Sequence, residues 1–310
     1  DCPATPYSSD PACGDACSDE YVLRTSLSTG AGASFIGEDG GDSSGNTVAD
    51  VGDVNGDGYD DIIIGAPYNT DGGNSAGQVY LILGKPSGWT PRVDLSTASA
   101  SFIGEAEADW AGYSIAGVGD VNNDNYDDFI IGSPYNDYGA DKVGQAYLIL
   151  GKASGWAMRT SLANANASFI GENLDDRAGW KVAGAGDVNN DGYDDILIGA
   201  YANDDNGLQS GQTYLIFGKA SGWAMRTSLT NSDASFIGEG QGDGAGIGLD
   251  CAGDVNGDNY DDFIIGAWNT GNGGETYLIF GKASGWAMRT SLANASASFR
   301  SEGYGDYAGR

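Results

Sequence analysis

One acidic segment of nine residues occurs four times in the sequence. It reads DVNGDGYDD at residues 53–61, and close copies occupy residues 120–128, 187–195 and 254–262. Each copy has Asp, Asn, Asp and Asp at positions 1, 3, 5 and 9, and the backbone carbonyl of a Tyr at position 7. All of these donors are oxygens, and calcium takes about 6 to 8 oxygen ligands. The loop reaches that number if the Asp at position 9 binds through both of its oxygens and one water is added. Each segment is therefore predicted to be a calcium loop, with about one ion per complete repeat.

The predicted ligands have the same types and positions in all four segments, which we number loops 1 to 4. Magnesium fits this donor set less well, because it demands a stricter octahedral geometry. The predicted ligands are Asp53, Asn55, Asp57, Tyr59 and Asp61 in loop 1; Asp120, Asn122, Asp124, Tyr126 and Asp128 in loop 2; Asp187, Asn189, Asp191, Tyr193 and Asp195 in loop 3; and Asp254, Asn256, Asp258, Tyr260 and Asp262 in loop 4.

Positions 4 and 6 of the loops support this interpretation. They hold only Gly or Asn, which adopt left-handed backbone conformations at low cost, as a chain wrapped around an ion requires. The alternative is a solvated acidic turn, but four copies with the same donors at the same offsets argue against it. An EF-hand begins similarly, yet it has Glu at position 12 and flanking helices, whereas position 12 here is Ile64 or a copy of it and the flank is a β-type run.

The loops recur with a fixed period. They begin at residues 53, 120, 187 and 254, which is 67 residues apart each time. The Gly-Lys pairs and Ser-Gly-Trp segments keep this interval, except that the last one shortens to 63 because four residues are missing between Gly266 and Gly274. A deletion confined to one stretch predicts a loop there.

Short apolar and β-branched runs predict four strands per repeat. Representative runs are residues 114–118 before a loop, 128–131 after it, 146–150 next, and 100–104, which ends the preceding repeat. Short strands at a fixed period are typical of propeller blades, which bury their faces against their neighbours. We therefore predict an all-β protein: a β-propeller of four-stranded antiparallel blades, with four complete repeats of about 67 residues and partial ones at the ends.

The composition is that of an acidic, folded protein. Lys and Arg number 14 against 44 Asp and Glu, for a formal net charge of -30, so repulsion argues against a nucleic-acid partner. Apolar residues make up 40% of the chain, which is enough for packed cores. No apolar run is long enough for a transmembrane segment. The sequence opens at Asp1 without a Met, as a processed secreted precursor would, and we expect an extracellular or cell-surface location.

The four cysteines agree with an extracellular location. Cys2, Cys13 and Cys17 crowd a leader rich in Pro, Ser and Asp, whereas Cys251 lies inside a repeat. We favour one disulfide within the leader and one that ties it to Cys251, and the alternative is a free buried thiol at Cys251. Zinc is disfavoured, since His is absent and the leader lacks paired C-x-x-C spacing.

Strand order assigns the loops to two faces. In an antiparallel meander the calcium loops share one face, here called the metal face, with the Gly-Lys-x-Ser-Gly-Trp segments, whose Lys and following Arg residues are expected to form a basic ring there. The recurring Trp residues are predicted to anchor blade packing; they are Trp89, Trp156, Trp223 and Trp286. On the opposite face, aromatics that do not recur are either candidate ligand contacts or the result of drift; they are Trp110, Tyr135, Tyr138, Trp180, Tyr201 and Trp268.

These features resemble the FG-GAP repeat family, the calcium-bearing blades of integrin α-subunit propellers and of many bacterial surface proteins. The resemblance covers residues from about 33 to 310 and rests on the acidic loops, on Gly65-Ala66-Pro67 and on GQVYLILG from Gly77. It implies calcium coordination on the loop between strands 1 and 2 of each blade.

The sequence departs from the family pattern in two places. Ala replaces the aromatic of the FG element in three repeats, and Tyr201 and Trp268 replace the proline of GAP.

We expect a Cys-containing N-terminal segment at residues 1–20 and the FG-GAP propeller at residues 21–310. Ring closure has three solutions: four or five blades that close, a piece of a longer propeller, or blades completed by neighbouring molecules.

Three classes of function remain. We favour a non-enzymatic, calcium-stabilised surface, adhesion or structural module, which binds a protein or glycan at the cell surface or self-associates into a filament or layer. The second class is a carbohydrate-binding propeller, and the third, less favoured, is a polysaccharide-active enzyme. The absence of His excludes His-dependent catalysis. The once-per-blade Glu38, Glu105, Glu172 and Glu239 are interpreted as strand-end residues, and no catalytic residue is predicted.

Overall fold

The recurring apolar runs form strands in all four repeats. The computed structural model describes residues 32–271, 273–303 and 305–310. Helix within them is limited to the three-residue 3-10 turns η2 (Leu95–Thr97), η3 (Leu162–Asn164), η4 (Leu229–Asn231) and η5 (Leu292–Asn294). The described part of the chain contains no helix with the length and apolarity to cross a membrane. The all-β prediction is confirmed.

Each repeat folds into one antiparallel sheet, a blade, whose four main strands pair in chain order. Blade 1 contains β2 (Thr47–Asp50), β3 (Ile62–Ala66), β4 (Gln78–Ile82) and β6 (Ala100–Ile103). Blade 2 contains β7 (Ser114–Gly119), β8 (Asp128–Ser133), β9 (Gln145–Ile149) and β11 (Ala167–Ile170). Blade 3 contains β12 (Lys181–Gly186), β13 (Asp195–Ala200), β14 (Gln212–Ile216) and β16 (Ala234–Ile237). Blade 4 contains β17 (Ala245–Gly253), β18 (Asp262–Ala267), β19 (Glu275–Ile279) and β21 (Ala297–Arg300).

A two-residue strand from the following repeat extends each of the first three blades. These strands run parallel to the fourth strand of the blade: β10 (Thr160–Ser161) pairs with β6, β15 (Thr227–Ser228) with β11, and β20 (Thr290–Ser291) with β16. In the same way β5 (Val93–Asp94) pairs with β1 (Phe35–Ile36), which takes the place of a fourth strand before blade 1. This fifth strand could not be predicted from the sequence, because two residues carry no periodicity.

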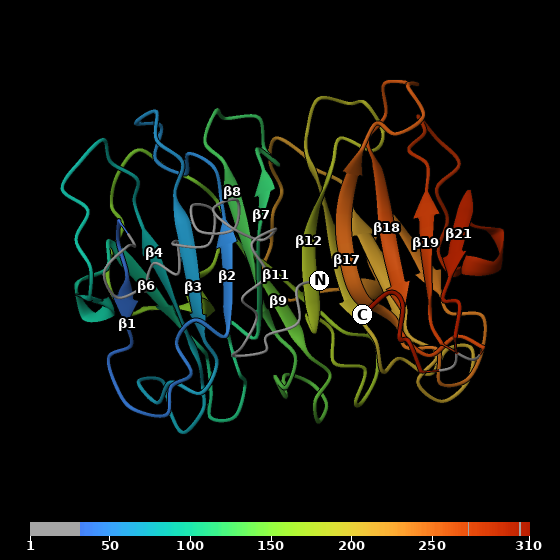
Figure 1. The fold of residues 1–310 in the computed structure, drawn as a ribbon, viewed down its shortest axis with the longest axis horizontal. Coiled ribbons are helices and arrows are strands. Elements are labelled where there is room, and N and C mark those ends of the chain that lie inside the picture. The colour runs from blue at the N-terminus through green and yellow to red at the C-terminus, as the bar shows by residue number, and fades with distance from the viewer. Residues whose placement is uncertain (1–31, 272, 304) are drawn as a thin grey trace, which may run out of the picture.

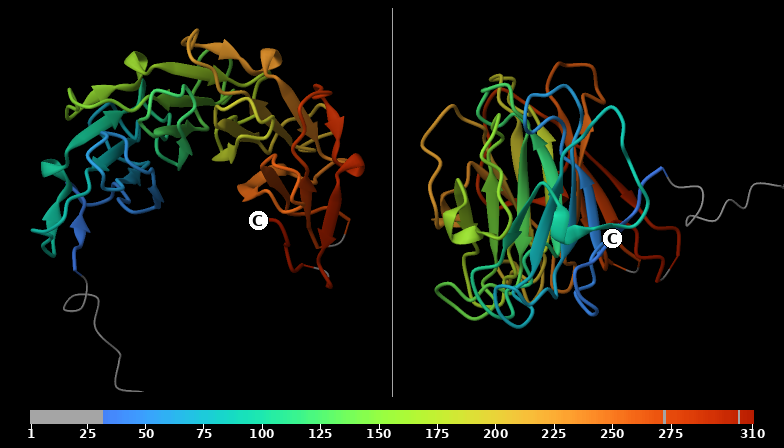
Figure 2. Two further views of the ribbon diagram at one scale, coloured as in Figure 1. Left: turned by 90° about the horizontal axis from the view of Figure 1, so that it is seen from above. Right: turned by 90° about the vertical axis from the view of Figure 1, so that its left-hand side faces the viewer.

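The four blades stand side by side in an arc (Figure 1). Seen from above, the first strand of each blade lies on the concave side and the two ends of the arc are apart (Figure 2). The first strands β2, β7, β12 and β17 contact one another in order and line a groove of about 420 Å³. The blades are therefore arranged as in a propeller, with loops 1 to 4 at one end of the strands and the opposite loops at the other end.

Aromatic side chains fill the space between adjacent blades. Between blades 1 and 2, Phe102 meets Phe129 edge-on at 5.5 Å between ring centroids, and Trp156 stacks on Phe129 at 6.3 Å. This confirms the predicted packing role for Trp156. Phe102 is 4% exposed, whereas the equivalent Phe299 of blade 4, which no later blade covers in the described residues, is 60% exposed. Burial of a blade thus depends on its neighbour, as in other repeat proteins.

Glycine in the second strand allows the blades to approach closely. A Cβ atom at Gly132 would lie 2.1 Å from the carbonyl oxygen of Gly179, at the start of blade 3. Gly65 and Gly199 face a carbonyl of the next blade in the same way. The Gly of the Gly-Ala-Pro element is therefore required by packing even where its proline is replaced.

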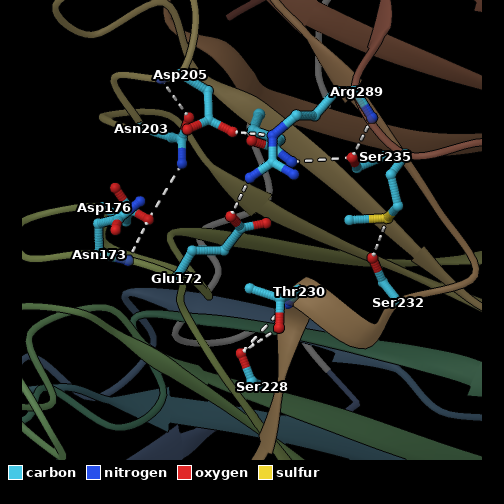
Figure 3. Close-up of polar contacts among 12 residues, drawn as sticks. Glu172, Asn173, Asp176, Asn203, Asp205, Ser228, Thr230, Ser232, Ser235 and Arg289 are labelled. Carbon is cyan, nitrogen blue, oxygen red and sulfur yellow. Dashed lines mark hydrogen bonds and ion pairs between the residues drawn. The ribbon is translucent and has the colours of Figure 1, made fainter.

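Arginines that directly precede the two-residue fifth strands form ion pairs with earlier blades. Figure 3 shows Arg289, which precedes β20, between Glu172 and Asp205, with its Nη2 2.6 Å from Glu172 Oε2. Arg159 pairs equivalently with two carboxylates. The basic ring expected on the metal face is therefore wrong for these arginines, because acidic residues at the other ends of the strands attract them. The lysines instead lie over the recurring Trp rings, at 4.7 to 4.9 Å from the ring centroid.

Replacing Asp176 with Asn is expected to weaken the pH dependence of stability. Asp176 is buried and accepts hydrogen bonds from the Asn173 N–H and from Asn203 Nδ2 (Figure 3), and burial raises its pKa from 3.8 to about 6. The folded state therefore holds this proton more tightly than the unfolded chain does, so the free energy of unfolding falls as the pH rises from about 4 to about 6. In Asp176→Asn, the decrease in the free energy of unfolding between pH 4 and pH 7 should be smaller by roughly 1 to 3 kcal/mol.

Urea unfolding at both pH values, in chelator, measures this difference. The matched control is Asp141→Asn, at a carboxylate whose side chain is 61% exposed. The same pH dependence in Asp176→Asn and in the native sequence would contradict the prediction.

Cys251 lies in β17 and lines the groove on the concave side. It is exposed and forms no disulfide with any of the described residues, so the alternative of a buried thiol is wrong. Cys2, Cys13 and Cys17, and the boundary predicted between residues 20 and 21, lie outside the described residues. The pairing of Cys251 with the leader stays a prediction.

Nonreducing peptide mapping is expected to find Cys251 joined to a peptide that contains Cys2, Cys13 or Cys17. Exposure of Cys251 leaves it accessible to a second thiol, and an extracellular protein would keep the bond oxidised. Alkylation of Cys251 without prior reduction would contradict the link.

Candidate metal centre

Each predicted calcium loop joins the first and second strands of its blade. Loop 1 lies between β2 and β3, loop 2 between β7 and β8, loop 3 between β12 and β13, and loop 4 between β17 and β18. The Gly151 N–H donates a hydrogen bond to Asp128 of loop 2, and the Lys152 N–H donates to the carbonyl of Val54 in loop 1. These contacts confirm that the Gly-Lys segments share the metal face with the loops.

The aspartate at position 1 organises each loop. In loop 1, the Asp53 carboxylate accepts hydrogen bonds from the N–H groups of Gly56, Asp57 and Gly58 at 2.8 to 3.0 Å. The residues at positions 4 and 6 have φ between 56° and 90° in all four loops. The prediction of left-handed backbone at these two positions is confirmed.

Position 9 places a fully buried carboxylate at the base of each loop. Asp61, Asp128, Asp195 and Asp262 are 0% exposed. Each accepts one N–H from position 2 of its own loop and one from the Gly of the next Gly-Lys pair. Burial raises the pKa of Asp128 to about 7 and that of Asp195 to about 8. No Lys or Arg in the described ranges forms an ion pair with these carboxylates, and a buried carboxylate without a cation is costly.

Two of the position-3 amides leave an oxygen unpaired. Asn122 Oδ1 and Asn189 Oδ1 are buried and have no hydrogen-bond partner within the described part of the chain. In loops 1 and 4 the same oxygen accepts the N–H of position 5. A buried oxygen without a donor, in a loop that also buries a carboxylate, fits a hard cation.

The aspartates of a loop do not form a complete cage as they stand. Among the residues that the structure describes, no group of three or more Asp, Glu, Cys or His side chains has the arrangement to hold a metal ion. The carboxylates at positions 1 and 5 instead accept N–H groups of their own loop, as in loop 2. The loops therefore fit calcium by donor type and position, and loops 2 and 3 also by an unpaired oxygen.

Position 8, which is not a predicted ligand, connects neighbouring loops. Its carboxylate accepts the N–H of position 1 in the preceding loop, at 2.8 to 3.0 Å. The three contacts, each between residues 74 apart, are Asp127 with Asp53, Asp194 with Asp120, and Asp261 with Asp187. The sequence signal for this role was the recurrence of Asp at position 8, but a motif within one loop does not reveal a partner in another.

Aromatic rings form a continuous group at the face opposite the loops. Neighbouring ring centroids lie 4.1 to 6.4 Å apart from blade 1 to blade 3. We name this group the aromatic surface; it consists of Tyr68, Trp110, Tyr113, Tyr135, Trp180 and Tyr201, all half-buried. Tyr138 lies apart from it beside Arg226, and Trp268 lies beside Tyr307. Tyr68 and Tyr113 were missed, because single aromatics beside scaffold motifs look like packing residues.

Comparison with known proteins agrees with this architecture. The FG-GAP repeat matches residues 45–82, 111–149 and 178–216, which contain loops 1 to 3 with their flanking strands. The chain is 31% identical over 236 residues to integrin alpha pat-2 of Caenorhabditis elegans, covering 72% of this chain and 18% of that protein. It is 33% identical over 236 residues to integrin alpha-V of Gallus gallus, covering 70% and 19%. It is 35% identical over 162 residues to integrin alpha-IIb of Mus musculus, covering 51% and 15%.

The chain spans less than a fifth of the length of each of these relatives. The similarity nevertheless extends over most of this chain in the first two. Blade 4 repeats the loop and the strand order of the three matched repeats. The matched repeats, the blade structure and the integrin alpha relatives together show that this chain contains FG-GAP repeats.

Proposed function

We propose that this chain is a calcium-stabilised β-propeller segment of an extracellular adhesion or structural protein. The observation that carries the proposal is the fourfold recurrence of an oxygen-rich loop over a fully buried carboxylate that no described Lys or Arg neutralises. Bound calcium supplies the positive charge that offsets this carboxylate. The proposed ligands are positions 1, 3, 5 and 9 and the position-7 carbonyl of each loop.

Calcium content tests the proposal. Protein saturated with calcium and then freed of unbound ion is expected to contain about four ions per chain by elemental analysis. Calorimetric titration of chelator-treated protein should give the same stoichiometry for calcium and weaker binding for magnesium. Less than one calcium per chain after saturation would overturn the assignment.

Kinship with integrin alpha chains supports a non-enzymatic adhesion role at the cell surface, with a protein ligand. The recurring glutamates support the same conclusion, because Glu38, Glu105 and Glu172 each form an ion pair with an arginine that precedes a fifth strand. Residues held once per blade in structural pairs are poor candidates for a catalytic pair. Binding of the chain to immobilised matrix proteins, lost on addition of chelator, is the expected result, and hydrolysis of a polysaccharide panel would contradict it.

A carbohydrate ligand is the second candidate, and the aromatic surface is the observation that favours it. Half-exposed, contiguous rings offer stacking faces across three blades, and the Arg177 guanidinium lies 5.3 Å from the ring centroid of Tyr135 as a hydrogen-bond donor beside them. A glycan array is expected to show binding that Trp180→Ala abolishes and Tyr138→Ala, outside the surface, retains. Equal binding by both variants would exclude the aromatic surface.

Self-association into a filament or layer is the structural form of the proposal. The ends of the arc expose apolar side chains, with Val48 at 69% and Phe299 at 60%. Covering them requires another blade, from this polypeptide or a second molecule. Electron microscopy of native material would show fibres or sheets if a second molecule covers them, and isolated particles would contradict assembly.

A further inference from the structure

The four loops are joined in series by hydrogen bonds between blades. Asp194, at position 8 of loop 3, accepts the N–H of Asp120, the position-1 ligand of loop 2, at 2.9 Å. In return, the Asp194 N–H donates to the carbonyl of Asp120 at 3.4 Å. A third bond runs from the Lys219 N–H to the carbonyl of Val121 at 2.8 Å. Equivalent bonds join loops 1 and 2 and loops 3 and 4, and we name each set of three a bracket.

A glycine directly before each of loops 1 to 3 makes room for the position-8 carboxylate of the next loop along the chain. Gly119 precedes Asp120 with φ 68°, and a Cβ there would lie 2.1 Å from Asp194 Oδ2. Gly253 precedes loop 4 with nearly the same φ, 65°, but a Cβ there would meet no atom of the described residues within 4 Å. Substitution of each of these two glycines can therefore separate the effect of losing the bracket from the effect of straining the backbone.

We propose that Asp127, Asp194 and Asp261 are positioning residues, each of which preorganises the calcium loop of the preceding blade. The inference rests on the proposed calcium function. Because the bracket fixes both backbone groups of position 1, it fixes the Cα from which that ligand side chain extends. A ligand held in advance loses less conformational freedom when the ion binds. The affinity of loops 1 to 3 for calcium thus depends on the blade that follows, in one direction along the chain.

Asp194→Ala tests this direction. It is expected to weaken calcium binding in loop 2 about tenfold, the size of effect that follows from losing a charge-assisted hydrogen bond, and to leave loop 3, which carries the substitution, much less affected. Hydrogen exchange at graded calcium concentrations, followed in peptides over residues 120–128 and 187–195, locates the change. Asp194→Asn keeps a side-chain oxygen as acceptor and should restore most of the affinity.

Two matched pairs control the experiment. Asp60 is exposed and occupies position 8 of loop 1, and its side chain has no hydrogen-bond partner in the described part of the chain. Asp60→Ala should therefore leave calcium binding unchanged in every loop. Gly119→Ala should weaken calcium binding in loop 2 more than Gly253→Ala weakens it in loop 4, since both substitutions strain the backbone equally and only the first displaces Asp194.

Weakening confined to loop 3, or equal in loops 2 and 3, would overturn the proposal. If Asp194→Ala does not fold, Asp127→Ala and Asp127→Asn make the same test on loop 1. Absence of calcium-dependent protection in the native sequence would instead refute the proposed function. The bracket is then still measurable without calcium, because the Asp120 amide should exchange faster in Asp194→Ala than in Asp60→Ala, and equal rates would overturn the positioning role.

Discussion

Removing calcium is expected to lower the melting temperature of this protein by more than about 10 °C, and adding calcium back should restore it in a concentration-dependent way. Four buried position-9 carboxylates are the physical reason, since each is fully shielded from water and lies in a loop with three further aspartates. Calcium that binds only the folded state stabilises it by mass action, about 2.7 kcal/mol per site at a hundredfold excess over Kd. Several sites therefore produce a large shift.

Thermal melts with chelator, with calcium and with magnesium measure this effect. Magnesium should recover less of the lost melting temperature than calcium does. Magnesium prefers a regular octahedron of ligands, whereas each loop offers more ligands in a less regular arrangement. An unchanged melt in chelator, together with no calcium in elemental analysis, would contradict the assignment.

Features encoded within one repeat could be predicted from the sequence. The strand at 114–118 appears as β7, and the left-handed positions 4 and 6 appear in every loop. Both depend on local sequence, namely an apolar run and the backbone freedom of Gly and Asn. Four copies at one interval supplied the confirmation that a single copy lacks. The blade and the location of the loops followed from these two facts.

Features that depend on contacts between repeats could not be predicted. The strand β10 exists only because the edge of β6 in the preceding blade accepts it. Arg159 reaches carboxylates 88 and 121 residues away, so its position in a Gly-Lys segment gave the wrong face. Position 8 was not predicted as a ligand, and its hydrogen bond to the preceding loop cannot be seen in a single motif. The ligand set itself remains a prediction that mutation must decide.

Asp187→Ala is expected to remove about one of the four calcium ions. Asp187 occupies position 1 of loop 3, where its carboxylate accepts the N–H groups of Asp191 and Gly192 at 3.0 and 2.8 Å. The substitution removes a proposed ligand, which is also the acceptor of these two hydrogen bonds. It leaves Asp195 fully buried at the base of the loop. Because blades contact mainly their neighbours, hydrogen-exchange protection should weaken near residues 182–200 first, while the other loops stay loaded.

The control for this prediction is Asp194→Asn, in the same loop and at position 8. Its side chain contacts loop 2 and is not a proposed ligand of loop 3, and the amide oxygen can still accept the Asp120 N–H. This variant should therefore retain four ions by elemental analysis. If both variants retain four ions, or both lose the same number, then positions 1, 3, 5, 7 and 9 are not the ligand set, because a true ligand must differ from a neighbour whose carboxylate is committed to another blade.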